Sequence, residues 1–283
     1  MDFPRSKAEA ACVQYRLCLR IANLEARAPR RFAVCDIMTR PALLNNVAHK
    51  NLRVIARYGA EFGDSIGSVV TFPTEYADVQ REYPIFFRKD PATGEYRSIA
   101  LLGFDKNENL FLDAGRWAAS YVPGIVARGP FLIGFQEHSV DGELRTAPVI
   151  HVDLDHPRIS FSEGEPVFLP QGGNSPFLEH IMTLLRGIRE GVEISKAMFA
   201  AFTALDLIEP VKLEVKLDDE HGYSVVGLHT ISRQRLQALE DAALAALHRA
   251  GFLEGAYLVL ASMNNVKKLM AMKQRRDQQA GVA

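Results

Sequence analysis

The order in which strand-like and helix-like patterns follow one another limits the folds open to this chain. Short runs rich in β-branched and aromatic residues occupy residues 68–161, with Pro- and Gly-containing turns between them. After Gly172 and Gly173, apolar residues recur at helical spacing instead. Because strands come first, helices come later and strict strand–helix alternation is absent, the sequence predicts an α+β fold with a largely antiparallel sheet. Its N-terminal half should be strand-rich and its C-terminal half helix-rich.

Turn residues, and the alternation of apolar and charged residues along one segment, predict two hairpins. PIFFRKD (84–90) and YRSIALLGF (96–104) flank PATGE, a turn with one proline and one glycine, and so predict an antiparallel pair. VKLEVKL (211–217) alternates apolar and charged residues, which is the pattern of a half-buried strand. HGYSVVGLHTI (221–231) can return beside it as the second strand of a hairpin.

Capping residues predict helices in the C-terminal half. Ser175 can begin the first, with Pro176 at its first position and Gly191 at its end. Ser195 can begin a second helix, which Pro210 stops.

Ser232 can begin a third helix that ends at Gly251, and a last helix covers about residues 256–273. Before the strands, apolar residues at helical spacing predict one amphipathic helix. The chain is therefore expected to divide into three parts: a helical N-terminal extension (1–42), a single domain (43–270) and a polar, frayed tail (271–283).

Composition narrows the function classes. The chain has 33 basic and 34 acidic residues, so it lacks the basic excess typical of nucleic-acid-binding proteins. No uncharged apolar run approaches the roughly 20 residues of a membrane-spanning helix, and no signal-peptide pattern opens the chain. The three cysteines all lie within the first 35 residues and provide no disulfide framework for the rest. We therefore expect a soluble, cytoplasmic protein with no membrane span and no nucleic-acid partner.

The stretch ENLFLDAGRWAASYVPGIVARGPFLIGF (108–135) contains the only tryptophan of the chain but no catalytic constellation. Its simplest interpretation is core packing, since aromatic residues dominate protein cores. The alternative is a ligand pocket, because pockets are mostly apolar with a few placed polar groups. In that case Arg128 would anchor an anionic or peptide-like ligand, and Arg116 would be more exposed to solvent. The candidate ligand-binding residues are Trp117, Tyr121, Arg128, Asn109 and Arg116.

HVDLDHP (151–157) is the one metal-like cluster. His151 and Asp153 are two residues apart, so on a strand they face the same side. A later histidine, His229 or His221, could complete the two-histidine, one-carboxylate set of non-haem iron enzymes. A polar turn explains the same residues, and a chain with eight histidines produces such combinations by chance. No cofactor is therefore predicted, with iron as the alternative.

Several segments of the chain resemble the SapC family of bacterial proteins. The matching pieces are REYPIFF (81–87), IALLGF (99–104), ENLFLDAGRW (108–117) and SYVPGIVARGPF (120–131). LLNNVAHKNLRV (43–54) resembles the opening segment of the family, and GLHTIS (227–232) and LHRAGFLEGAYLVLASMNNVKKL (247–269) are weaker matches. The resemblance covers about residues 43–270. It implies an association with surface-layer loci and carries no agreed biochemical activity.

Three hypotheses on function follow. The first is a non-catalytic or accessory binding protein with an aromatic-lined pocket near Trp117 for a small anionic or peptide-like ligand. A protein partner is compatible with this hypothesis. The second is a metal-dependent oxygenase of the non-haem iron type. The third, a surface-layer-related structural protein, rests on the resemblance alone. Whether the chain is an enzyme stays open at this point.

Overall fold

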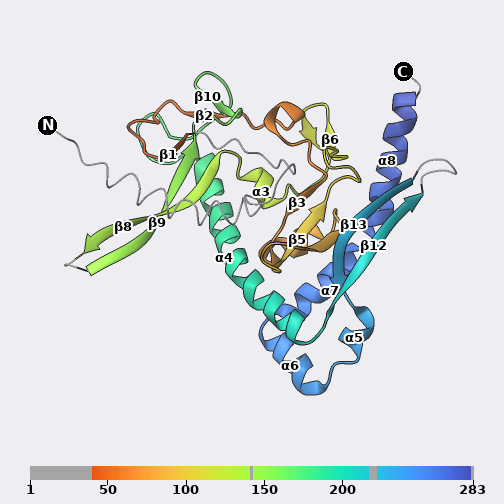
Figure 1. The fold of residues 1–283 in the computed structure, drawn as a ribbon. Coiled ribbons are helices and arrows are strands. Elements are labelled where there is room, and N and C mark those ends of the chain that lie inside the picture. Colours follow the sequence, from red (N-terminus) through yellow and green to blue (C-terminus); the bar gives the residue numbers. More distant parts are fainter. Residues whose placement is uncertain (1–39, 141–142, 217–221, 282–283) are drawn as a thin grey trace. The chain divides into compact units, whose positions relative to one another are not determined.

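A computed structural model describes residues 40–140, 143–216 and 222–281 (Figure 1). The helix predicted before residue 40, the three cysteines and His221 lie outside the described residues. The chain forms two compact units, each built from two separate stretches. Unit 1 contains the residues up to Ala56 and Arg128–Leu185, and unit 2 contains Arg57–Ala127 and Arg186–Ala283. Helices and antiparallel sheets are both present, so the predicted α+β class is confirmed.

Unit 1 contains two small antiparallel sheets. The first has the order β1–β9–β8, and its longest pairing joins β8 to β9. The second has the order β10–β2–β11. The bounds are β1 (Pro41–Leu43), β2 (Arg53–Val54), β8 (Phe131–Val140), β9 (Glu143–Asp153), β10 (Ile159–Ser160) and β11 (Glu165–Pro166).

The core of unit 1 joins strand residues to the start of a long helix, α4 (Pro176–Ala204). Ser175 caps this helix as predicted, since its Oγ accepts a hydrogen bond from the Leu178 N–H at 3.2 Å. The buried residues of this core are Leu52, Val54, Phe131, Val152, Val167, Phe168, Leu178, Ile181 and Leu185.

Unit 2 is organised around a five-stranded antiparallel sheet with the order β12–β13–β4–β5–β3. Both predicted hairpins are confirmed: β4 pairs with β5, and β12 pairs with β13, with a bulge between Val211 and Leu213. A two-stranded sheet, β6–β7, lies in the same unit. The bounds are β3 (Ser68–Val70), β4 (Ile85–Lys89), β5 (Tyr96–Leu101), β6 (Leu112–Asp113), β7 (Arg116–Trp117), β12 (Ile208–Lys216) and β13 (Gly222–Ile231).

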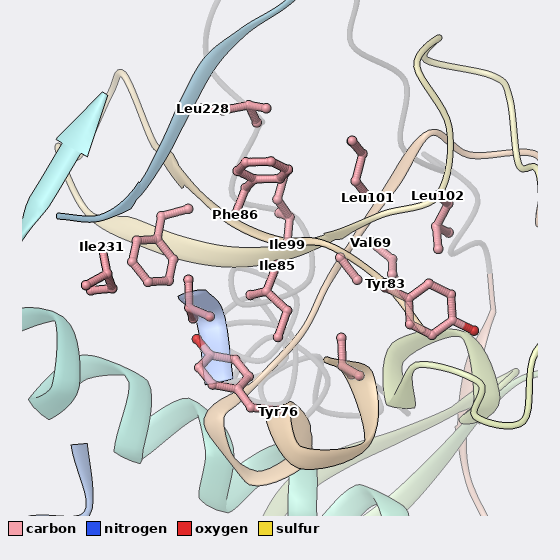
Figure 2. Packing of buried hydrophobic residues seen from close by; sticks show 14 of the residues in the cluster. Val69, Tyr76, Tyr83, Ile85, Phe86, Ile99, Leu101, Leu102, Leu228 and Ile231 are labelled. Carbon is pink, nitrogen blue, oxygen red and sulfur yellow. The ribbon is translucent and has the colours of Figure 1, made fainter. Parts of the chain in front are cut away.

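The centre of this sheet is buried on both faces. Ile85 and Phe86 are neighbours in β4 and point to opposite sides, with Tyr76 below the sheet and Leu228 above it in Figure 2. On one face the Phe87 ring meets Phe199 of α4 edge-on, with ring centroids 5.0 Å apart. This two-sided burial explains why the strand reads as an uninterrupted apolar run.

Short helices and the C-terminal helices complete unit 2. The segments before the central strands are η1 (Ala60–Phe62), η2 (Pro73–Glu75) and α2 (Tyr76–Val79), and α3 (Gly124–Ala127) follows β7. The C-terminal helices are α5 (Arg233–Gln237), α6 (Asp241–Arg249), α7 (Phe252–Ser262) and α8 (Asn265–Gly281).

The prediction that Gly191 ends a helix is wrong, because α4 runs through it to Ala204. A Cβ at Gly191 would lie 2.5 Å from the Cβ of Phe72, so glycine allows a close approach here rather than a helix end. Ser195 does not begin a second helix either. Its Oγ donates to the Gly191 carbonyl at 2.7 Å, within the same helix.

Two further helix boundaries differ from the prediction. The third helix is divided into α5 and α6, although Gly251 is left-handed (φ 76°) after α6, as expected of a residue past a helix end. The last predicted helix, about residues 256–273, is divided into α7 and α8, and α8 continues to Gly281, where a frayed tail was expected. Lys273 and Asp277 form an ion pair at 3.0 Å along this extension, which supports the helix.

Among the described residues, no single helix combines the length and apolarity needed to cross a membrane. One bent pair, Asp241–Arg249 with Phe252–Gln279, meets the criteria of length and composition when its two parts are taken together.

Candidate functional site

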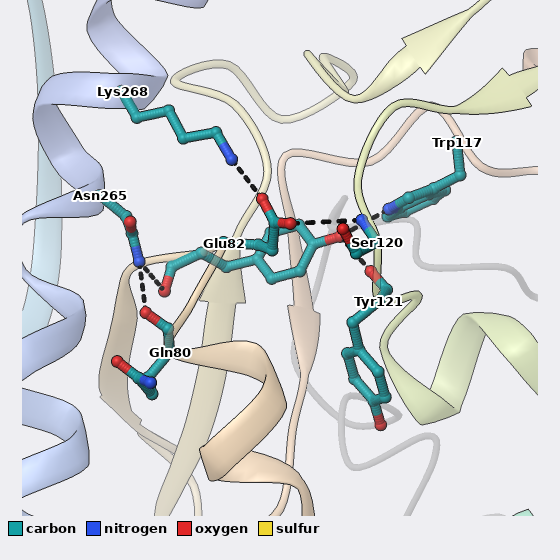
Figure 3. A network of polar contacts seen from close by, with 8 residues as sticks. Gln80, Glu82, Trp117, Ser120, Tyr121, Asn265 and Lys268 are labelled. Atoms are coloured by element: carbon teal, nitrogen blue, oxygen red, sulfur yellow. Dashed lines mark hydrogen bonds and ion pairs between the residues drawn. The ribbon is translucent and has the colours of Figure 1, made fainter.

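Trp117 lies in a hydrogen-bonded aromatic group of unit 2. It ends the short β6–β7 hairpin, whose turn residues Ala114 and Gly115 have positive φ angles of 44° and 81°. The indole is 8 % exposed, and its Nε1–H donates to the Tyr83 hydroxyl at 2.6 Å. The Tyr83 hydroxyl in turn donates to the Tyr121 carbonyl (Figure 3). Burial raises the pKa of Tyr83 above its ordinary value, so this donor stays protonated.

Tyr121 is tied to a buried carboxylate by its hydroxyl group. Glu75, 8 % exposed, accepts from the Tyr121 hydroxyl at 2.6 Å and from the Gly124 N–H at 2.8 Å through Oε2. Its Oε1 accepts from the Thr71 hydroxyl at 2.7 Å and from the Phe72 N–H at 3.1 Å. Burial, then the nearby Glu75 charge, raise the pKa of Tyr121. The four donors offset the desolvation of the carboxylate, and they fix the chain just before α3.

Glu82 links the same segment to α8. Its carboxylate accepts from the Ser120 N–H at 3.3 Å and forms an ion pair with Lys268 of α8. The hydrogen bond from Lys268 holds the pKa of Glu82 below its usual value. Asn265 donates to the carbonyls of Gln80 and Tyr83, at 2.6 and 3.2 Å (Figure 3). Side chains of residues 71–83 therefore hold residues 117–124 in place. Lys268 and Asn265 of α8 in turn bind residues 80–83.

Asn109 and Arg116 have different surroundings. Asn109 is 2 % exposed; its Nδ2 donates to the Asp64 carbonyl at 2.8 Å, and its Oδ1 accepts from the Phe111 N–H at 3.0 Å. These bonds shape the loop before β6. Arg116 is exposed, as the sequence predicts.

Arg128 begins the second stretch of unit 1, where it lies close to two other basic side chains. Its Nη1 donates to the Phe131 carbonyl at 2.8 Å. Next to it, a Cβ on Gly129 would be 3.8 Å from Cδ of Arg158, a side chain that is only 4 % exposed. Nη1 of Arg158 donates to the Ile55 carbonyl at 3.2 Å. The structure thus places the Arg158 side chain beside Gly129, the residue that follows Arg128 in the sequence.

His156 is the third member of this basic group. Its Nδ1 accepts a hydrogen bond from the Arg158 backbone N–H at 3.1 Å. Burial, followed by the charges of Arg158 and Arg128, lowers the pKa of His156 to about 4, so the ring is neutral near pH 7. Sequence reasoning assigned DLDHP to a polar turn and missed His156 and Arg158, since nothing in the local pattern shows that His156 lies within the electrostatic influence of Arg128 or that Arg158 lies beside Gly129.

The residues of the iron hypothesis belong to two different units. His151 and Asp153 lie on β9 of unit 1, and His229 lies on β13 of unit 2. The His151 ring lies against Gly134, where a Cβ would approach it to 2.3 Å, and burial lowers the pKa of this histidine. The His229 ring meets Tyr96 edge-on at 5.2 Å. Within the part of the chain that the structure describes, no group of three or more His, Cys, Asp and Glu residues is placed to hold a metal ion.

In a comparison with protein families, the SapC family model matches residues 44–269 of the chain. The chain belongs to the SapC family. The match includes most of the described residues of both units, and it confirms the resemblance read from the sequence. No curated protein and no solved structure matches this SapC-family chain.

Proposed function

We propose that the chain is an accessory binding protein without catalytic chemistry of its own. Its ligand is a small anion or the anionic end of a peptide, and Arg128 in unit 1 anchors that ligand. The observation that carries the proposal is the position of Arg128, which is next to Gly129 where the Arg158 side chain lies, and near enough to His156 for its charge to lower the pKa of that ring.

Arg128 and His156 suit an anion because of the hydrogen-bonding groups that they provide, whereas the Arg158 side chain is only 4 % exposed and donates to the Ile55 carbonyl. Guanidinium groups are donors only. Since Nδ1 of His156 accepts a hydrogen bond, the proton of its neutral ring is on Nε2, which is also a donor. Oxyanions form their strongest hydrogen bonds with charged donors of this kind. Asp153 and Asp155 belong to the same turn, where Asp153 Oδ1 accepts a hydrogen bond from the Asp155 N–H at 3.2 Å.

The proposal leaves Trp117 and Tyr121 out of the binding site. The indole N–H and the Tyr121 hydroxyl both take part in internal hydrogen bonds of unit 2. These bonds support the packing interpretation of those two aromatic residues, whereas the proposed anion binding is assigned to Arg128.

The proposal is tested by titrating the full chain with defined anions. Suitable probes are inorganic phosphate, succinate, and one short peptide with either a free or an amidated C-terminus, with binding followed by calorimetry and native mass spectrometry. We expect Arg128→Gln to weaken binding about tenfold or more, because a hydrogen bond to a charged group contributes about 1.5–3 kcal/mol. Arg128→Lys should retain part of the affinity, since it keeps the charge and loses the planar fork.

Arg116→Gln is the matched control, because Arg116 is an exposed arginine of the other unit. Its affinity for the probes should equal that of the wild type. Equal binding by Arg128→Gln and wild type, or failure of every probe to bind, would overturn the proposal. Iron at nearly one equivalent in protein purified without chelator, lost in the His151→Ala and Asp153→Ala variants, would favour the oxygenase hypothesis instead. Concentration-dependent assembly into ordered arrays would favour the surface-layer hypothesis.

A further inference from the structure

No further inference is drawn: the strongest candidate, the outer edge of the ten-residue strand β8 in unit 1, which has no neighbouring strand on that side among the described residues, is an unpartnered sheet edge, and nothing in the structure shows what covers it.

Discussion

Two buried threonines of unit 2 differ in how their hydroxyl groups are satisfied. Thr71 is 1 % exposed and donates to Glu75 at 2.7 Å. Thr230 is 9 % exposed, and its Oγ1 has no hydrogen-bond partner among the described residues. A buried hydroxyl without a partner lowers the free energy of unfolding, so a substitution that removes it also removes this cost. Removing one partner of a buried hydrogen bond instead leaves the other partner unsatisfied.

We therefore expect the same substitution to have opposite effects at these two positions. Thr230→Val should leave the free energy of unfolding unchanged or raise it. Thr71→Val should lower it by about 1–3 kcal/mol, because the buried Glu75 carboxylate loses a donor. Urea denaturation of both variants measures the difference. A substantial loss of stability in Thr230→Val would show that its hydroxyl does have a partner.

Trp117 and Arg116 are adjacent residues that we expect to respond very differently to truncation. Trp117→Ala removes a buried ring that contacts Tyr58 and Phe111, and should cost about 3–5 kcal/mol. Arg116→Ala changes an exposed side chain and should stay within about 0.5 kcal/mol of the wild type. Thermal unfolding at equal protein concentration compares them. A near-neutral Trp117→Ala would contradict the packing role of the indole.

At the scale of secondary-structure elements, local signals predicted the strands better than the helix ends. The hairpins β4–β5 and β12–β13 follow from turn residues and alternation, which act between sequence neighbours. The continuation of α4 through Gly191 depends instead on its contact with Phe72, a residue more than a hundred positions away. A glycine that permits close packing looks like a helix end when only the local sequence is read.

The candidate site shows the same limit. Sequence reasoning selected Arg128 because it stands between an apolar run and Gly129–Pro130, and expected Arg116 to be exposed because it follows a glycine turn. It could not select His156 and Arg158, since only the folding of the strands between them places Arg158 beside Gly129 and His156 within the electrostatic influence of Arg128. It also could not assign the Tyr121 hydroxyl to Glu75, which lies 46 residues earlier.

The ion pair between α8 and Glu82 should make stability depend on pH. Because Lys268 lowers the pKa of Glu82 in the folded state, the pair contributes stability above the unfolded pKa of about 4.3, and this is lost as pH falls through the lower folded pKa. Lys268→Met should therefore destabilise the protein near pH 7, by no more than about 1 kcal/mol, since Lys268 is 42 % exposed.

This difference between Lys268→Met and wild type should shrink towards zero below about pH 4, and at high salt. The neighbouring exposed Lys267 provides the control, and Lys267→Met should show no such pH dependence. Urea denaturation across the acid range measures both variants. A difference that stays constant with pH would mean that α8 is held there by packing of the lysine stem instead.

At the scale of the whole molecule, each unit depends on two distant stretches of chain. In unit 2, β4 from the first stretch pairs with β13 from the second, and the Ile85 N–H donates to Ser262 of α7 at 2.8 Å. In unit 1, Leu52 and Val54 of the first stretch share a core with Phe131, Leu178 and Ile181 of the second. A cut after residue 172, where the sequence changes from strand-rich to helix-rich, would therefore divide both cores.

We expect residues 43–172 and 173–270, produced as separate chains, to lack cooperative thermal unfolding. The first fragment would expose the β4 edge that β13 covers, and the second would contain β12 and β13 without the rest of their sheet. Co-expression of the two fragments is the control, because each supplies the surfaces that the other lacks, and a cooperative transition should return. Calorimetry and circular dichroism measure both conditions. If each fragment melted cooperatively by itself, the cores could not depend on both stretches, and the prediction that residues 43–270 behave as one domain would fail with it.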